Sequence, residues 1–152
     1  IAFNQATNAG GLRLDGGSIV NCTIATNRAS AAGGAGGVYQ TGGVATNCIV
    51  YFNGDAAGNA ANALGPVTNY RFSCASELTP GANGNVAADP RFRDAVRGNV
   101  RLARESPGVN AAASLPWMAG ALDLDARPRI VSGLPDMGCY EASAAGMAFT
   151  FR

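Results

Sequence analysis

Few residue types in this chain could carry chemistry. Its 152 residues include no histidine and no lysine, so all eleven basic side chains are arginines, set against ten acidic residues. Histidine is the commonest general base and metal ligand near neutral pH, so catalysis would have to rest on Asp, Glu, Arg, Tyr, Ser or Cys. The net charge of +1 gives no electrostatic reason to expect a nucleic-acid partner.

The pair of carboxylates Asp123-x-Asp125 resembles the start of a calcium-binding loop. Such a loop needs further oxygen ligands and usually a glycine, but Ala126 follows Asp125 directly. We therefore favour a polar turn in which Asp125 pairs with Arg127 or Arg129. Asp123 and Asp125 remain the sole metal candidates, for calcium, and we expect no other cofactor.

The remaining acids do not suggest an enzyme. Glycoside hydrolysis needs two carboxylates that face one groove. Asp15 and Asp55 are isolated in the first half of the chain, and Asp94, Asp136 and Glu141 are expected to pair with arginines at the surface. We predict no catalytic residue in this segment, although catalytic residues could precede it in a longer protein.

A repeat in the sequence indicates which secondary-structure elements would position these side chains. The stretch "GGLRLDGGSIVNCTIATN" from Gly10 matches "GGVYQTGGVATNCIVYFN" from Gly36 at an offset of 26 residues. A weaker copy places Thr68–Phe72 on Thr46–Val50, and Ile1–Asn4 matches the end of the first copy. A period of this length is typical of stacked supersecondary units.

The repeat predicts strands rather than helices. Residues 18–25 and 44–52 are short, rich in β-branched side chains and bounded by glycine or asparagine, with alternate side chains on one face. The paired glycines suit corners that need positive φ. We expect an all-β parallel β-helix over residues 1–75, in which each repeat forms one rung.

Stacked rungs would place equivalent side chains above one another. Asn21 with Asn47, continued by Asn69, and Asn27 with Asn53, preceded by Asn4, are expected to form asparagine ladders at corners. Cys22 over Cys48 is expected to form an interior ladder. A disulfide or a reactive thiol is one interpretation of this cysteine pair, but we favour two small buried hydrophobic side chains.

The second half changes character. Residues 76–141 lack the repeat and are expected to form a loop-rich C-terminal cap, followed by a tail at residues 142–152. Its proline residues fix corners and remove hydrogen-bond donors, which stops strand pairing. Trp117 is expected to plug the end of the core beside Leu115 and Met118, with an exposed sugar platform as the alternative.

Four motifs of this half occur in a recognisable order. They are "GNVAADPRFRD" from Gly84, "GNVRLARESPGVNAA" from Gly98, "DLDARPRI" from Asp123 and "PDMGCYE" from Pro135. As an ordered set they resemble the C-terminal region of bacterial choice-of-anchor Q proteins. Members of that family often have an Asp where this chain has Asn110, and a Gly where it has Ala126.

This resemblance implies a right-handed parallel β-helix of the pectate-lyase-like superfamily, exported to the cell surface or beyond. In such an extracellular protein, Cys74 and Cys139 could form a disulfide that ties the cap to the last rung, although Cys74 could instead stay buried and free. No apolar run is long enough to span a membrane, so no transmembrane segment is expected.

Three functional hypotheses follow. The leading one is a non-catalytic structural protein, a stalk, fibre or matrix component, whose partners are copies of itself or upstream rungs of the same parent chain. The second is the C-terminal part of a polysaccharide lyase or hydrolase whose catalytic rungs lie upstream. The third is a module that binds surface glycans through Trp117, Tyr39 and Tyr51, although these aromatic residues do not repeat in register.

Overall fold

The computed structural model describes residues 1–131 and 133–142, and within them the chain is all-β. No α-helix occurs in these residues, and four single-turn 3-10 helices connect the strands: η1 (Val67–Asn69), η2 (Ala82–Gly84), η3 (Ala95–Arg97) and η4 (Pro116–Met118). The strands are β1 (Gln5–Ala6), β2 (Leu12–Leu14), β3 (Ser18–Val20), β4 (Thr23–Ala25), β5 (Arg28–Ala29), β6 (Val38–Gln40), β7 (Val44–Thr46), β8 (Ile49–Tyr51), β9 (Ala63–Leu64), β10 (Tyr70–Arg71), β11 (Phe92–Asp94) and β12 (Asn99–Leu102).

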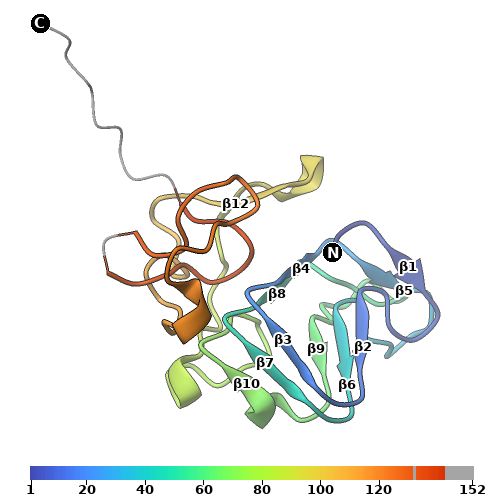
Figure 1. Ribbon diagram of the computed structural model, residues 1–152. Helices are drawn as coiled ribbons and strands as arrows, with labels where there is room; N and C mark the ends of the chain where they lie inside the picture. Colours follow the sequence, from blue (N-terminus) through green and yellow to red (C-terminus); the bar gives the residue numbers. More distant parts are fainter. Residues whose placement is uncertain (132, 143–152) are drawn as a thin grey trace, which may run out of the picture.

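The strands of the first half form four small parallel sheets. Their orders are β2-β6-β9, β3-β7-β10, β4-β8 and β1-β5, and Figure 1 shows them lying side by side. Ser18 pairs with Val44 and Thr23 with Ile49, which is the offset at which the sequence repeats. Equivalent segments of successive repeats therefore hydrogen-bond to each other.

The third copy pairs in a different register from the one expected. Tyr70 lies beside Ala45 and Arg71 beside Thr46, so the alignment of Thr68–Phe72 with Thr46–Val50 is wrong by three residues. Asn69 consequently lies in η1 and does not follow Asn47. Cys74 bridges to Ile49 instead of aligning with Phe52.

Each expected long strand is divided in two by an asparagine. Asn21 and Asn47 have positive φ values of 51° and 55°, a conformation that asparagine tolerates better than most residues. Residues 18–25 and 44–52 therefore turn a corner in the middle, and side chains before and after it do not share one strand face. At these two corners the residue with positive φ is an asparagine and not a glycine.

The paired glycines act in two ways. Gly17 and Gly43 have positive φ, as their turns require. Gly37 has no positive φ and is needed because the neighbouring backbone approaches closely. A Cβ atom on Gly37 would lie 2.2 Å from the Asn62 carbonyl oxygen, so no side chain fits there.

Two apolar clusters hold the chain together. The first lies between the parallel sheets and contains buried side chains from all three repeats: Leu14, Ile24, Val38, Ala45, Cys48, Val50, Ala63, Tyr70, Ala75 and Leu78. The second joins the outward side of β8 to the C-terminal half and contains Ile49, Cys74, Leu102, Ala112 and Met137. β8 is thus covered on both faces, with Val50 in one cluster and Ile49 in the other.

The C-terminal half lies against the side of the parallel sheets (Figure 1). The Ala113 N–H donates to Asn47 Oδ1 at 2.8 Å, and the Cys139 N–H donates to Thr23 Oγ1 at 3.1 Å. Within its described residues, the one pair of named strands is the antiparallel hairpin β11–β12. Trp117 is 53% exposed and does not plug the core, while the neighbouring Met118 is buried. Of the expected tail at residues 142–152, all but Ala142 lies outside the described residues.

Candidate functional site

A row of outward-pointing side chains marks one corner of the repeats. Phe3, Thr26 and Phe52 occupy equivalent positions, because Ala2 pairs with Ala25 and Ala25 with Tyr51 just before them. All three have φ between 57° and 59°. Phe3 is 59% and Phe52 45% exposed, unusual for phenylalanine side chains. Two of the three positions in this row therefore present aromatic rings to solvent, with Thr26 between them.

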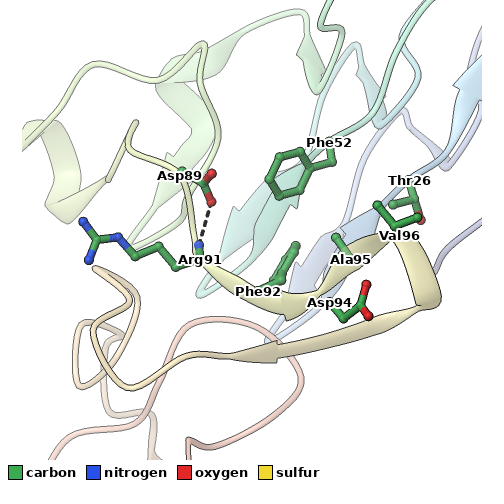
Figure 2. Close-up of a pocket in the computed structure, with 8 residues that line it drawn as sticks. All are labelled: Thr26, Phe52, Asp89, Arg91, Phe92, Asp94, Ala95 and Val96. Atoms are coloured by element: carbon green, nitrogen blue, oxygen red, sulfur yellow. Dashed lines mark hydrogen bonds between the residues drawn. The ribbon is translucent and has the colours of Figure 1, made fainter.

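The hairpin β11–β12 hangs over this corner and makes a groove. Phe92 from β11 faces Phe52, with ring centroids 6.0 Å apart, and the η3 turn places the exposed Val96 beside them. Figure 2 shows both rings bordering one hollow, with Thr26 at its far end. The hollow measures about 520 Å³, within the range of small-molecule sites. We call it the aromatic groove; it is lined by Thr26, Phe52, Asp89, Arg91, Phe92, Asp94, Ala95 and Val96.

The charged residues at the rim already have partners. Asp89 Oδ1 accepts a hydrogen bond from the Arg91 N–H at 2.7 Å, and the Arg91 guanidinium points away from the rings towards the Glu105 carbonyl. Asp94 accepts from the N–H and the guanidinium of Arg97. These carboxylates are exposed or half-buried and keep lone pairs for ligand hydroxyl groups, but they do not form a buried pair for acid–base chemistry.

A second hollow continues the groove on the other side of Phe52. It measures about 500 Å³ and shares Thr26 and Phe52 with the first, and its other lining residues include the polar side chains of Arg28 and Asn59. Phe52 is therefore a ridge between two neighbouring depressions. An extended ligand with apolar faces and hydroxyl edges would fit this alternation of ring and polar group.

The residues beside this row form an asparagine ladder inside the corner. Asn4 Nδ2 donates to Asn27 Oδ1, Asn27 Nδ2 to Asn53 Oδ1, and Asn53 Nδ2 to Asn62 Oδ1, at 3.0 to 3.2 Å. Each Oδ1 also accepts the backbone N–H of the preceding residue in the ladder. Asn62 ends the series by donating to Ser76 Oγ at 2.9 Å. Asn27 and Asn53 thus lie in contact, as the repeat predicts. Asn62 extends their ladder although it does not belong to the repeat.

Asn21 and Asn47 form a second ladder, of two members, at the other corner. Asn47 Nδ2 donates to Asn21 Oδ1 at 3.1 Å and to the Ala113 carbonyl at 2.9 Å. Asn47 is fully buried because the C-terminal half covers it. Its side chain therefore links the repeats to the rest of the chain.

All four cysteines are free thiols in this structure. Cys22 and Cys48 lie on adjacent repeats and contribute to the same apolar cluster. Cys74 is buried in the second cluster, where its thiol donates to the Ala88 carbonyl at 3.2 Å, and burial raises its pKa to about 12. The predicted bond between Cys74 and Cys139 is not formed.

Asp123 and Asp125 shape a turn. Asp123 Oδ1 accepts the backbone N–H groups of Asp125 and Arg127, and Oδ2 accepts that of Glu141. Asp125 forms a two-point ion pair with Arg101, at 2.6 and 2.7 Å, so the expected pairing with Arg127 or Arg129 is wrong. The same ion pair lowers the pKa of Asp125. Both carboxylates are thus occupied by the protein itself.

The acids expected at the surface include a buried set. Glu141 pairs with Arg129 at 3.4 Å, and both are below a tenth exposed. Arg129 also donates to the Gly138 and Cys139 carbonyls, which fixes the last described turn. Burial raises the pKa of Glu141 to about 7 and also raises that of Asp136. Because these groups bond mainly to nearby backbone, we assign them a structural role.

Within residues 1–131 and 133–142, no three acidic or cysteine side chains gather as they would to hold a metal ion, and no helix has the length and apolarity to cross a membrane. No protein-family model matches the chain, and no curated protein and no solved structure is significantly similar to it. The site must therefore be interpreted from its own geometry.

The sequence pointed to other aromatic residues. Tyr39 stacks beneath the Arg13 guanidinium at 5.3 Å, and Trp117 lies away from the groove lining. A signal for the groove was nevertheless present: Phe3, Thr26 and Phe52 each precede a ladder asparagine at the same place in the repeat. Phe92 gave no such signal, because it lies in the second half of the chain, outside the repeat.

Proposed function

We propose that this chain is part of an exported bacterial surface protein with a structural role, built on a right-handed parallel β-helix. The observation that carries the proposal is the parallel pairing of residues 26 apart in three sheets. Stacked repeats with internal ladders make stiff, extensible shafts. The ordered motifs, which resemble those of choice-of-anchor Q proteins, support the proposed export and surface location.

The partners of the carboxylates at the aromatic groove favour a structural role over an enzymatic one. Around the aromatic groove, the carboxylates of Asp89 and Asp94 lie beside their own arginine and backbone partners. The alternative of a lyase or hydrolase with catalytic rungs upstream predicts activity in the longer protein that is lost when an upstream acid or arginine is replaced.

Assembly state tests the structural role. We expect purified protein to form oligomers or fibres as its concentration rises, measured by sedimentation velocity and electron microscopy. Heterologous contacts between ends of identical shafts would produce such species. A protein that stays strictly monomeric at high concentration would contradict self-assembly and leave attachment to a larger chain as the structural role.

A second candidate function, glycan binding, is favoured by the aromatic groove. Phe52 stands between two depressions, of about 520 and 500 Å³, and Phe92 faces it from the hairpin. Sugar rings stack their C–H faces on aromatic side chains and direct hydroxyl groups to polar rims. The groove therefore suits a linear, neutral polysaccharide better than a charged one.

Replacing Phe52 by Ala tests this second function. We expect Phe52→Ala to abolish retention on neutral polysaccharides in affinity electrophoresis, and Trp117→Ala, a matched exposed aromatic residue outside the groove, to leave retention unchanged. Equal retention of both variants, or loss only in Trp117→Ala, would refute binding at the groove.

A further inference from the structure

Two thiols lie stacked between consecutive repeats. Cys22 and Cys48 each follow a corner asparagine and precede a pair of strands in register, Thr23 beside Ile49. The Ile49 N–H donates to the Cys22 carbonyl at 2.9 Å, which fixes the two backbones next to each other at this point. Both side chains reach the same apolar cluster, so they point to the same side.

Their spacing is close to that of a disulfide. Neighbouring strands lie roughly 4.8 Å apart. Bonded cysteines have Cα atoms about 4.4 to 6.8 Å apart and Cβ atoms about 3.5 to 4.5 Å apart. At this general spacing the Cα atoms fall within the disulfide range, and the Cβ atoms would have to move closer together to reach theirs. A bond formed here would therefore be strained and readily reduced.

The two thiols differ in character. Cys22 is half-buried, whereas Cys48 is completely buried. The neighbouring Cys48 side chain lowers the pKa of Cys22 to about 6, with a smaller contribution from the Arg129 guanidinium, and correspondingly the pKa of Cys48 is raised. This division into an accessible thiolate and a buried thiol resembles the attacking and resolving cysteines of dithiol redox pairs.

We propose that Cys22 and Cys48 form a reversible disulfide between consecutive repeats, made by exchange with a small disulfide such as oxidised glutathione. The Cys22 thiolate attacks one sulfur of the oxidant, giving a mixed disulfide and releasing one thiolate. Cys48 then loses its proton and attacks the Cys22 sulfur, releasing the second thiolate. Two electrons pass from the cysteine pair to the oxidant, and the two cysteine protons end on the two released thiols.

The other cysteines provide controls within the chain. Cys74 lies beside Ile49 instead of Cys48, in the second apolar cluster, and its raised pKa makes it a poor nucleophile. Cys139 is half-buried like Cys22 and is the competing partner that an experiment must distinguish. This inference does not depend on the proposed function.

The test is to incubate the folded, reduced chain with oxidised glutathione and to map the products by mass spectrometry after trapping free thiols. We expect the wild type, Cys74→Ser and Cys139→Ser to lose two hydrogen atoms and to yield a Cys22–Cys48 peptide. Cys48→Ser should instead keep a glutathione adduct on Cys22, because the resolving thiol is missing. The bond closes a loop of 26 residues, so the melting temperature of the wild type should rise by roughly 5 to 10 °C on oxidation.

Three outcomes would overturn the proposal. They are a Cys22–Cys139 peptide, cross-links only between separate chains, and no oxidation of the wild type under conditions that oxidise a free dithiol. The wild-type peptide map decides the matter even if a serine variant fails to fold. Alkylation by iodoacetamide at pH 6 gives a second measurement, since Cys22 should react about tenfold faster than an ordinary free cysteine.

Discussion

Replacing Asn53 by alanine should destabilise the chain more than the small number of atoms removed suggests. The Asn53 side chain makes five hydrogen bonds: Oδ1 accepts two from Asn27, and Nδ2 donates to the Ile24 and Tyr51 carbonyls and to Asn62 Oδ1. Asn53 is 3% exposed, so water does not readily replace these partners. The ladder therefore depends on an amide at this position.

The magnitude follows from what each lost contact leaves behind. The Asn27 N–H is buried and donates to Asn53 Oδ1, so its loss leaves an orphaned donor that costs about 1 to 3 kcal/mol. The other contacts keep alternative partners or reach the edge of the ladder, and add about 2 kcal/mol together. We expect Asn53→Ala to lower the free energy of unfolding by about 3 to 5 kcal/mol, a large share of the 5 to 15 kcal/mol usual for a domain.

Urea unfolding followed by circular dichroism measures this loss, with Asn8→Ala as the matched control, because Asn8 is an exposed asparagine in the same repeats. We expect the control to remain within about 0.5 kcal/mol of the wild type. A difference between the two variants of less than about 1 kcal/mol would refute the argument. It would mean that water or a shifted backbone satisfies the ladder as well as the amide does.

Three further predictions concern backbone fit and pH. Gly37→Ala should lower the free energy of unfolding by about 3 kcal/mol, because its Cβ would lie 2.2 Å from the Asn62 carbonyl oxygen, whereas Gly16→Ala, with open space around it, should change little in the same urea assay. Burial raises the pKa of Glu141 to about 7, so the folded state holds the proton of this carboxyl more tightly than the unfolded state does. The free energy of unfolding should therefore fall as pH rises from about 4.5 to 7. Glu141→Gln should reduce this fall when melting temperature is measured against pH. Backbone and amide donors lower the pKa of Asp55 to about 2, so its contribution is present above about pH 4 and lost as pH falls towards 2; the stability gap between the wild type and Asp55→Ala should close over that range, and a constant gap would contradict it.

The parallel pairing could be predicted because two copies of the repeat keep their paired glycines, their Asn-Cys and their closing asparagine in register. When strand residues and corner residues recur every 26 positions, the simplest arrangement stacks each segment on the equivalent segment of the next repeat. In the sequence, Asn69 resembles the corner asparagine, which predicts the wrong register for the third copy. In the structure Arg71 pairs with Thr46, so Phe72 takes the position equivalent to Asn47. Similar letters in a divergent copy do not fix a register when a loop of different length precedes them.

The contacts of the C-terminal half had no periodic signal. Asn47 binds Ala113, 66 residues away, and Thr23 binds Cys139, 116 residues away. Each contact occurs once, so nothing in the spacing announces it. The Arg101–Asp125 pair likewise has no signal in the sequence, because 24 residues separate its members and two other arginines lie nearer to Asp125 along the chain.

At the corner that carries the aromatic groove, neighbouring residues differ in role: one contributes to stability and the next to the proposed ligand-binding surface. In the left-handed position, the side chains of Phe3, Thr26 and Phe52 turn outward, and the asparagine that follows each turns inward to the ladder. The inward side chain is constrained by buried hydrogen bonds, whereas the outward one contributes little to the apolar core. Substitution of Phe52 therefore alters the surface presented to a ligand while the ladder beneath it stays intact. A loss of binding in Phe52→Ala can accordingly be assigned to the groove, which would not hold for a change at Asn53.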